Sequence, residues 1–364
     1  MRFIMRRWAG GPFSWPRRAG LLLALLLPLT ASAEPPRYRV ISGYAVRPAY
    51  GMNHFATLAG SEIDQATSRV YPAIGTPSVF RRLPALMAGG EGRAVAINDR
   101  GEVAGHAMTP APPPFETGLV AHAWYWSEAT GPIDLTPDIS GASFARAINN
   151  SGMIVGDRME GPNSGPFIWR VGAGGVVEER RIGSPDITSN DTYDVNELGV
   201  VVGTQFNHGW VYDAERGLLE ILPESGRGGA YGINDRNEIV GYVRDPEFVP
   251  RAALWRRVDG QWRLFDLGAL PDPNRSCAAI EINNAGTVIG ECIGPSGVPS
   301  RYFVHAGSEL TPIERLVADP RWSVVGLYDI NEAGQILAAA RFEGAPAVAV
   351  VLDPIARRPR PVRR

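Results

Sequence analysis

The sequence has 364 residues, enough for one large domain or two smaller ones. Its 31 prolines and 42 glycines are spread at intervals, which favours many short strands joined by turns over long helices. The net charge of −2 conceals two arginine-rich ends, and the chain between them carries 26 basic against 38 acidic residues. That acidic body, with a net charge of −12, argues against nucleic acid as the main partner.

Residues 1–33 have the features of a secretory signal peptide. Arginines precede an apolar run from Leu21 to Leu29, and Ala31-Ser32-Ala33 forms a small-residue cleavage site. The run is too short to span a bilayer, and no later stretch approaches the ~20 apolar residues of a membrane helix. We therefore expect a mature chain without a transmembrane segment, exported to the bacterial periplasm or the cell exterior. An uncleaved anchor is the alternative.

A short motif, an apolar residue followed by Asn and then by Gly three positions later, recurs along the chain. We call its asparagines the repeat asparagines: Asn53, Asn98, Asn149, Asn196, Asn234, Asn283 and Asn331. Asn suits the first position of a type I turn, and Gly suits the left-handed residue that closes it. Asn237 replaces this Gly in one copy, while Ala56 in the first copy predicts a different turn. Each copy therefore predicts two strands joined by a tight hairpin.

Two further strands follow in most copies, the third aromatic ("HAWYW", 122–126) and the fourth short and apolar ("IDL", 133–135). Four antiparallel strands in a unit of roughly 45 residues are typical of a β-propeller blade. The chain opens at 38–43 with a segment like a fourth strand without the preceding three, and it ends at 346–352 with a third strand that lacks its fourth. The first can therefore complete the last blade. The predicted fold is all-β: a seven-bladed β-propeller over 34–353, closed by the N-terminal strand and followed by a basic, disordered tail at 354–364.

The first strand of each unit predicts how the blades stack. The residue three before each repeat asparagine is mostly large, as in Tyr193, whereas the residues two and four before it are mostly small or acidic. Since side chains alternate along a strand, we expect the large set to pack against the small set of the next blade.

The third- and fourth-strand motifs carry a resemblance. His122-Ala123-Trp124 with Trp126, and the "DLGAL" stretch at 266–270, are similar to the HAF-repeat family of bacterial extracellular repeat proteins. The resemblance covers nearly the whole mature chain, although Arg251 and Arg301 stand where the family has His. It implies an exported repeat protein and carries over no catalytic residue.

The two cysteines, Cys277 and Cys292, flank one copy of the hairpin. A plain two-residue turn would place them opposite each other, whereas a bulge would shift the register and turn them to different faces. An oxidising compartment permits a disulfide, and both outcomes stay open at this point.

The candidate binding residues fall into two groups. His106, Phe115, Glu116 and His122 lie in or beside the longest connection between second and third strands, at 106–122, where function tends to sit on a rigid scaffold. Repeated strand-edge hydrogen bonding is the other interpretation of His122. The second group, Asp194, Glu281 and Asp329, stands two residues before repeat asparagines and is expected in the central channel. These three carboxylates bind a cation together, or each is neutralised by an arginine or a backbone N–H.

The turns offer too few acids for calcium and the five histidines lack metal-ligand spacing, so no metal and no cofactor is predicted. The leading hypothesis is a monomeric, non-enzymatic binding or interaction scaffold for a cell-surface glycan or a protein partner. The alternative is a hydrolase or lyase that acts on extracellular polysaccharide with carboxylates in the channel. A third possibility is a structural protein that assembles side by side.

Overall fold

The computed structural model describes residues 35–43, 48–111, 118–172, 174–183, 190–223, 228–271, 273, 275–307 and 309–355. The predicted signal peptide, almost all of the basic tail, and the candidates Phe115 and Glu116 lie outside these residues. In the described part of the chain, no helix has both the length and the apolar character needed to cross a bilayer.

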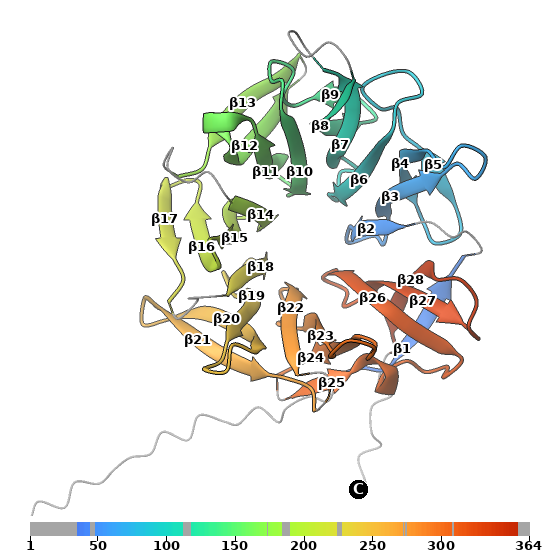
Figure 1. Cartoon of the computed structure of the whole chain (residues 1–364), viewed down its shortest axis with the longest axis vertical. Helices are drawn as coiled ribbons and strands as arrows, with labels where there is room; N and C mark the ends of the chain where they lie inside the picture. Colours follow the sequence, from blue (N-terminus) through green and yellow to red (C-terminus); the bar gives the residue numbers. More distant parts are fainter. Residues whose placement is uncertain are drawn as a thin grey trace, which may run out of the picture. The chain divides into compact units, whose positions relative to one another are not determined.

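Seven four-stranded antiparallel sheets form a closed ring of blades, which confirms the seven-bladed β-propeller (Figure 1). The first three blades are β2–β5 (Ala49–Met52, Leu58–Ile63, Val70–Gly75, Phe80–Arg82), β6–β9 (Gly92–Ile97, Val103–Pro110, Leu119–Ser127, Gly131–Asp134) and β10–β13 (Ala142–Ile148, Met153–Met159, Gly165–Gly172, Gly175–Arg181). Blades four and five are β14–β17 (Asn190–Val195, Val200–Gln205, His208–Asp213, Leu218–Ile221) and β18–β21 (Gly229–Ile233, Ile239–Arg244, Pro250–Val258, Gln261–Gly268). Blade six is β22–β25 (Ser276–Ile282, Val288–Ile293, Arg301–His305, Leu310–Pro312), and short 3₁₀ turns occupy Gly161–Asn163 and Ile313–Arg315.

The seventh blade joins the two ends of the chain. It contains β26 (Trp322–Ile330), β27 (Ile336–Phe342), β28 (Val348–Pro354) and, as its outer strand, β1 (Tyr38–Ser42). β1 pairs antiparallel with β28 from Tyr38↔Pro354 to Ser42↔Val350, and the Tyr38 side chain is fully buried. In Figure 1 the blue β1 lies against the red β28. The N-terminal strand therefore closes the ring and covers the edge of β28, as predicted.

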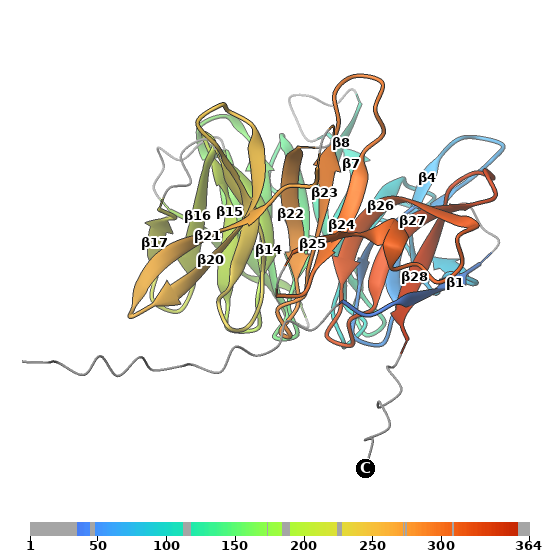
Figure 2. The same cartoon turned by 90° about the horizontal axis from the view of Figure 1, so that it is seen from below.

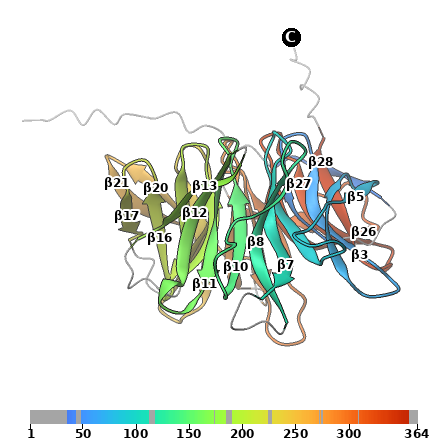
Figure 3. The ribbon, with the colours of Figure 1, turned by 90° about the horizontal axis from the view of Figure 1, so that it is seen from above.

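The two faces of the ring carry different connections. The turns between first and second strands lie on one face, the turn face; those between second and third strands, such as β19–β20 and β23–β24, project from the other, the loop face (Figures 2 and 3). The first strand of each blade lines the centre of the ring (Figure 1).

The hydrophobic core lies between neighbouring blades. In one cluster Trp124 of blade two packs with Ala59 and Ile74 of blade one, and in the next Trp169 of blade three packs with Ala104 and Ala123 of blade two. Both tryptophans are fully buried. Blades two to six therefore each bury an aromatic side chain of the third strand against the blade before them.

The turns follow the predicted chemistry. In blade three, Asn149 Oδ1 accepts hydrogen bonds from the backbone N–H groups of Ser151 at 3.1 Å and Met153 at 3.0 Å, and Gly152 closes the turn at φ +79°. The prediction that the first copy would differ is wrong. Ala56 takes the same left-handed conformation at φ +58°, and Asn53 Oδ1 accepts the same pair of bonds there, so the asparagine outweighs the modest strain of a left-handed alanine.

All seven first strands carry a bulge at the residue three before the repeat asparagine, as shown by register shifts such as Ala145/Ala147 and Ala279/Glu281. A bulge places two residues against one and re-aims side chains. The expectation that the large residues pack on the next blade is therefore wrong. Tyr50, Arg146 and Tyr193 instead face the central cavity.

The bulge in the first strand of blade six, β22, also decides whether Cys277 and Cys292 face each other. The Asn283 turn shifts the register by one residue, because Ile282 pairs with Val288, and the bulge at Ile280 shifts it back. Cys277 therefore pairs with Cys292, and the two form a disulfide. The register shift of the turn and the register shift at Ile280 cancel, so a bulged turn and a disulfide occur in the same hairpin.

Candidate functional site

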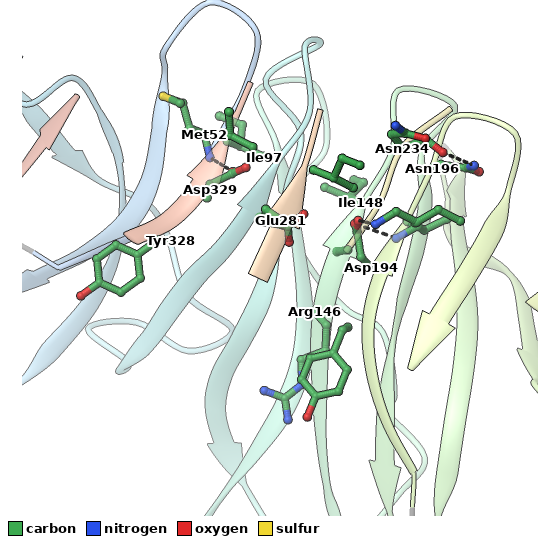
Figure 4. Close-up of a pocket in the computed structure, with 18 of the residues that line it drawn as sticks. Met52, Ile97, Arg146, Ile148, Asp194, Asn196, Asn234, Glu281, Tyr328 and Asp329 are labelled. Carbon is green, nitrogen blue, oxygen red and sulfur yellow. Dashed lines mark hydrogen bonds between the residues drawn. The ribbon is translucent and has the colours of Figure 1, made fainter. Parts of the chain in front are cut away.

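The candidate site is a cavity of about 270 Å³ along the ring axis, lined by first-strand residues (Figure 4). It has three levels: the asparagine turns at the turn face, a belt of carboxylates in the middle, and a group of aromatic and basic side chains towards the loop face. Each level has its own chemistry.

The repeat asparagines form a closed ring of hydrogen bonds at the turn face. Each Nδ2 donates to the backbone carbonyl of the next repeat asparagine, as in Asn149 to Asn196 at 2.9 Å, and Asn331 closes the ring on Asn53 at 3.2 Å. All seven side chains are buried. The prediction of a turn role is thus confirmed but incomplete, because the amide also ties each blade to the next.

A second set of bonds surrounds this ring and makes the turn-face mouth acidic. The N–H group after one repeat asparagine donates to the acid or amide after the next, as in Asn150 to Glu197 and Glu197 to Asp235. Burial raises the pKa of Glu197 and also that of Glu332.

The middle level contains the three predicted carboxylates. Asp194 Oδ2 accepts from the Ile233 N–H at 2.9 Å, and Asp329 Oδ2 accepts from the Met52 N–H at 2.7 Å, each across a blade boundary. Glu281 lies between them (Figure 4), and its Oε2 occupies the space that a side chain at Gly232 would need, since a Cβ there would lie 2.6 Å away.

Their protonation follows from burial. Burial raises the pKa of Asp194 to about 6 and that of Asp329 to about 7. The pKa of Glu281 is raised well above its usual value, first by burial and then by the charges of the two aspartates. The three carboxyls meet in the channel, as predicted. However, Asp194 and Asp329 accept hydrogen bonds from backbone N–H groups. The described residues also contain no cluster of three or more Asp, Glu, His or Cys side chains arranged to hold a metal ion.

Apart from His106, the side chains of the loop-face level were not candidates from the sequence. We define the mouth cluster as Tyr50, Arg93, His106, Phe144, Arg146 and Tyr193. Its members come from the first and second strands of blades one to four. Tyr50, Arg146 and Tyr193 line the cavity, and Tyr193 is 38% exposed. Tyr231 of the next blade continues the aromatic surface, with its ring 4.7 Å from Tyr193.

Arg146 is held in place by a buried acid. Its Nε donates to Asp157 Oδ2 at 3.2 Å, and Asp157 is only 2% exposed. Asp157 Oδ1 accepts in turn from the Thr192 N–H at 3.0 Å and from the Thr192 hydroxyl at 2.8 Å. Burial raises the pKa of Asp157 to about 6 despite the opposing charge of Arg146. The guanidinium also lies over the Phe144 ring at 5.4 Å.

Arg93 and His106 of the mouth cluster contact Tyr50 and Phe144. Arg93 Nη1 donates to Tyr50 Oη at 2.9 Å, and His106 lies edge-on to Phe144 with centroids 5.1 Å apart. Burial, together with the charges of Arg93 and Arg146, lowers the pKa of His106 to about 4. His106 is therefore neutral at physiological pH.

The loop face also carries exposed apolar side chains. Phe206 and Phe248 occupy neighbouring hairpin tips, are 65% and 55% exposed, and have φ of +47° and +66°. Bulky residues rarely adopt this left-handed conformation, and such strain concentrates at functional positions. Met159 and Ile293, at the loop-face ends of second strands, are also about half exposed, at 50% and 54%.

Of the two loop candidates among the described residues, the structure brings His106 into this site and leaves His122 outside it. His122 is 2% exposed, and its Nδ1 lies 2.9 Å from Asp134 Oδ2. The equivalent arginines pair in the same way, Arg251 with Asp266 and Arg301 with Glu314. This confirms strand-edge hydrogen bonding for His122. The signal that pointed to the missed residues is Arg146, the one basic residue at a position that is otherwise aromatic or aliphatic.

The comparisons with known proteins show the fold. No family model matches the chain, and no curated protein matches it. A prolyl endopeptidase structure is 13% identical with a TM-score of 0.56, over 88% of this chain and 47% of that one. An acylaminoacyl peptidase from Pyrococcus horikoshii is 15% identical with a TM-score of 0.50, over 85% and 51%. An ulvan lyase bound to a sulfated disaccharide repeat is 10% identical with a TM-score of 0.47, over 88% and 94%. The neighbours thus include enzymes with unlike substrates, and at these identities they establish the propeller alone.

Proposed function

We propose that the chain is an exported, non-enzymatic scaffold that binds a cell-surface glycan at the loop-face mouth of its channel. The observation that carries this proposal is the mouth cluster: an exposed tyrosine ring, a half-buried one and a fixed arginine line a cavity of about 270 Å³. Ligand sites are typically concave, aromatic-rich and provided with a few oriented polar groups. Aromatic rings supply flat surfaces for sugar rings, and arginine supplies hydrogen-bond donors.

The channel carboxylates support binding over catalysis. Asp194 and Asp329 hold neighbouring blades together through backbone N–H groups, so neither is free to move towards a substrate. The tyrosines also make poor bases, because burial raises the pKa of Tyr193 to about 12 and raises that of Tyr328. A phenol with such a pKa holds its proton at neutral pH.

One observation favours the enzyme alternative. The pKa of Asp329, at about 7, is close to that expected of a general acid at neutral pH. If the chain is a hydrolase or lyase, polysaccharides incubated with it release new reducing ends or unsaturated uronates, and Glu281→Gln abolishes the release. Product formation that depends on the channel carboxylates would replace the scaffold proposal.

A thermal-shift screen of residues 34–364 tests the scaffold proposal. A ligand present at 100 times its Kd stabilises the native state by about 2.7 kcal/mol, which gives a measurable rise in midpoint. We expect a surface glycan to raise the midpoint of the wild type and not that of Tyr193→Ala. A shift of equal size in both proteins would contradict binding at the mouth, and a shift only with an envelope protein would favour a protein partner.

A further inference from the structure

The mouth cluster contains an arginine whose hydrogen-bonding edge is free and fixed in direction. Asp157 takes only Nε of Arg146, and no hydrogen-bond partner of its two terminal nitrogens occurs among the described residues. Phe144 covers one face of the guanidinium. The two terminal N–H groups therefore form a pre-oriented planar fork beside the cavity that Arg146 lines.

A second cation adds to the same position. Arg93, on the neighbouring blade, is exposed, and no carboxylate lies within 4.0 Å of it in the part of the chain that the structure describes. Arg93 pairs with His106 across β6 and β7, His106 lies against Phe144, and Arg146 lies over the same ring, so the two arginines lie around one position. Asp157 pairs with Arg146, and Asp191, two residues before Tyr193, is exposed, so solvent screens its charge. Arg93 therefore presents a guanidinium that donates to Tyr50 and that pairs with no carboxylate among the described residues.

The geometry points to a carboxylate ligand. We infer that the mouth cluster binds the carboxylate of a uronic-acid residue in an acidic glycan, with Arg146 as a bidentate donor, Arg93 as a second contact, and Tyr50 and Tyr193 against the sugar ring. This inference rests on the proposed glycan-binding function. A planar fork matches a carboxylate, and tyrosine rings beside it suit the ring that carries the carboxylate.

The cavity of about 270 Å³ extends through all three levels, and the mouth cluster forms its loop-face end. An acidic peptide would also offer carboxylates to Arg146. The tyrosine rings at the mouth favour the sugar, and the test includes the peptide.

The experiment measures binding by titration calorimetry with oligomers of galacturonate, mannuronate and glucuronate-containing hyaluronan, each beside its carboxyl-reduced form. Reduction keeps the sugar backbone and removes only the charge. We expect at least one uronate oligomer to bind wild-type protein at least tenfold more tightly than its reduced partner. Arg146→Lys, which keeps the charge and removes the fork, should weaken binding about tenfold, and Arg93→Gln several-fold.

Arg263→Gln is the matched control, since Arg263 is an exposed arginine on the outer strand of blade five, and binding should be unchanged. Thermal melts confirm that each variant is folded. Equal binding of an oligomer and its reduced form, lost in Tyr193→Ala, would overturn the uronate inference while leaving the glycan scaffold intact. Binding of oligoglutamate but of no uronate, or uronate binding unaffected by both mouth arginine variants, would also overturn it.

Discussion

The ring of repeat asparagines allows the sharpest test of how the fold is held together. Turn chemistry alone does not require asparagine, because Asp245 makes the same kind of turn at the tip of blade five. Its Oδ1 accepts from the Glu247 N–H at 2.9 Å and the Val249 N–H at 2.9 Å, and Phe248 takes the left-handed position. Aspartate is thus fully competent as an acceptor there. The amide is needed for the bond that it donates to the next blade.

Asn149→Asp separates these two roles. The change keeps the acceptor oxygen and replaces Nδ2, which donates to the Asn196 carbonyl at 2.9 Å, with a second oxygen at a site only 3% exposed. The lost hydrogen bond costs about 1 kcal/mol, and a buried carboxylate facing a carbonyl adds roughly 1–3 kcal/mol. We expect the free energy of unfolding to fall by about 2–4 kcal/mol.

Urea unfolding of residues 34–364 measures this difference, and the thermal midpoint should fall by roughly 4–10 °C. The control is Asp245→Asn, which should change stability by no more than about 0.5 kcal/mol. If Asn149→Asp were as stable as the wild type, the inter-blade bond would contribute nothing and the turn explanation would suffice.

Three further predictions concern the channel, the disulfide and the closing strand. Burial raises the pKa of Glu281 and brings that of Asp329 to about 7, so the native state binds more protons than the unfolded chain between about pH 4 and 7. The two carboxyls should therefore cost no stability below about pH 4, and the free energy of unfolding should fall by ~2–4 kcal/mol as the pH rises to 7. Glu281→Gln should raise the melting temperature at pH 8 but not at pH 4. Replacing Cys277 and Cys292 together with serine removes a cross-link over 15 residues and should cost about 3 kcal/mol in urea unfolding, with reductant ineffective on the variant. Deleting residues 34–43 uncovers the edge of β28, so light scattering should detect aggregation, whereas removal of the tail after 355 should leave a monomer.

The architecture was accessible from the sequence because its signals are local. An asparagine and a left-handed residue define each turn within five residues, and their sevenfold recurrence predicts the blades. The first copy follows the pattern although Ala56 replaces the preferred glycine, because Asn53 accepts the hydrogen bonds of the turn. The pairing of β1 with β28 was predicted because the last unit lacks a fourth strand and the first segment of the chain supplies one.

The site was accessible only in part. That Asp194, Glu281 and Asp329 meet in the channel follows from their common position in the repeat. The mouth cluster depends on the bulge, a register effect set by the partner strand, which turns Arg146 towards the axis. The partner of Arg146 is Asp157, eleven residues away on the next strand, and Asp157 is fixed by Thr192 of another blade. No local pattern links these three residues, so only the folded ring brings them together.

The central claim is that the loop-face mouth is the ligand site. The most direct measurement is a crystal structure of residues 34–364 grown with the tightest-binding uronate oligomer. Our account predicts a sugar ring against Tyr50 and Tyr193, with its carboxylate within hydrogen-bonding distance of both terminal nitrogens of Arg146. Sugar bound at the turn face or on the outer strands, with no density at the mouth, would contradict the account.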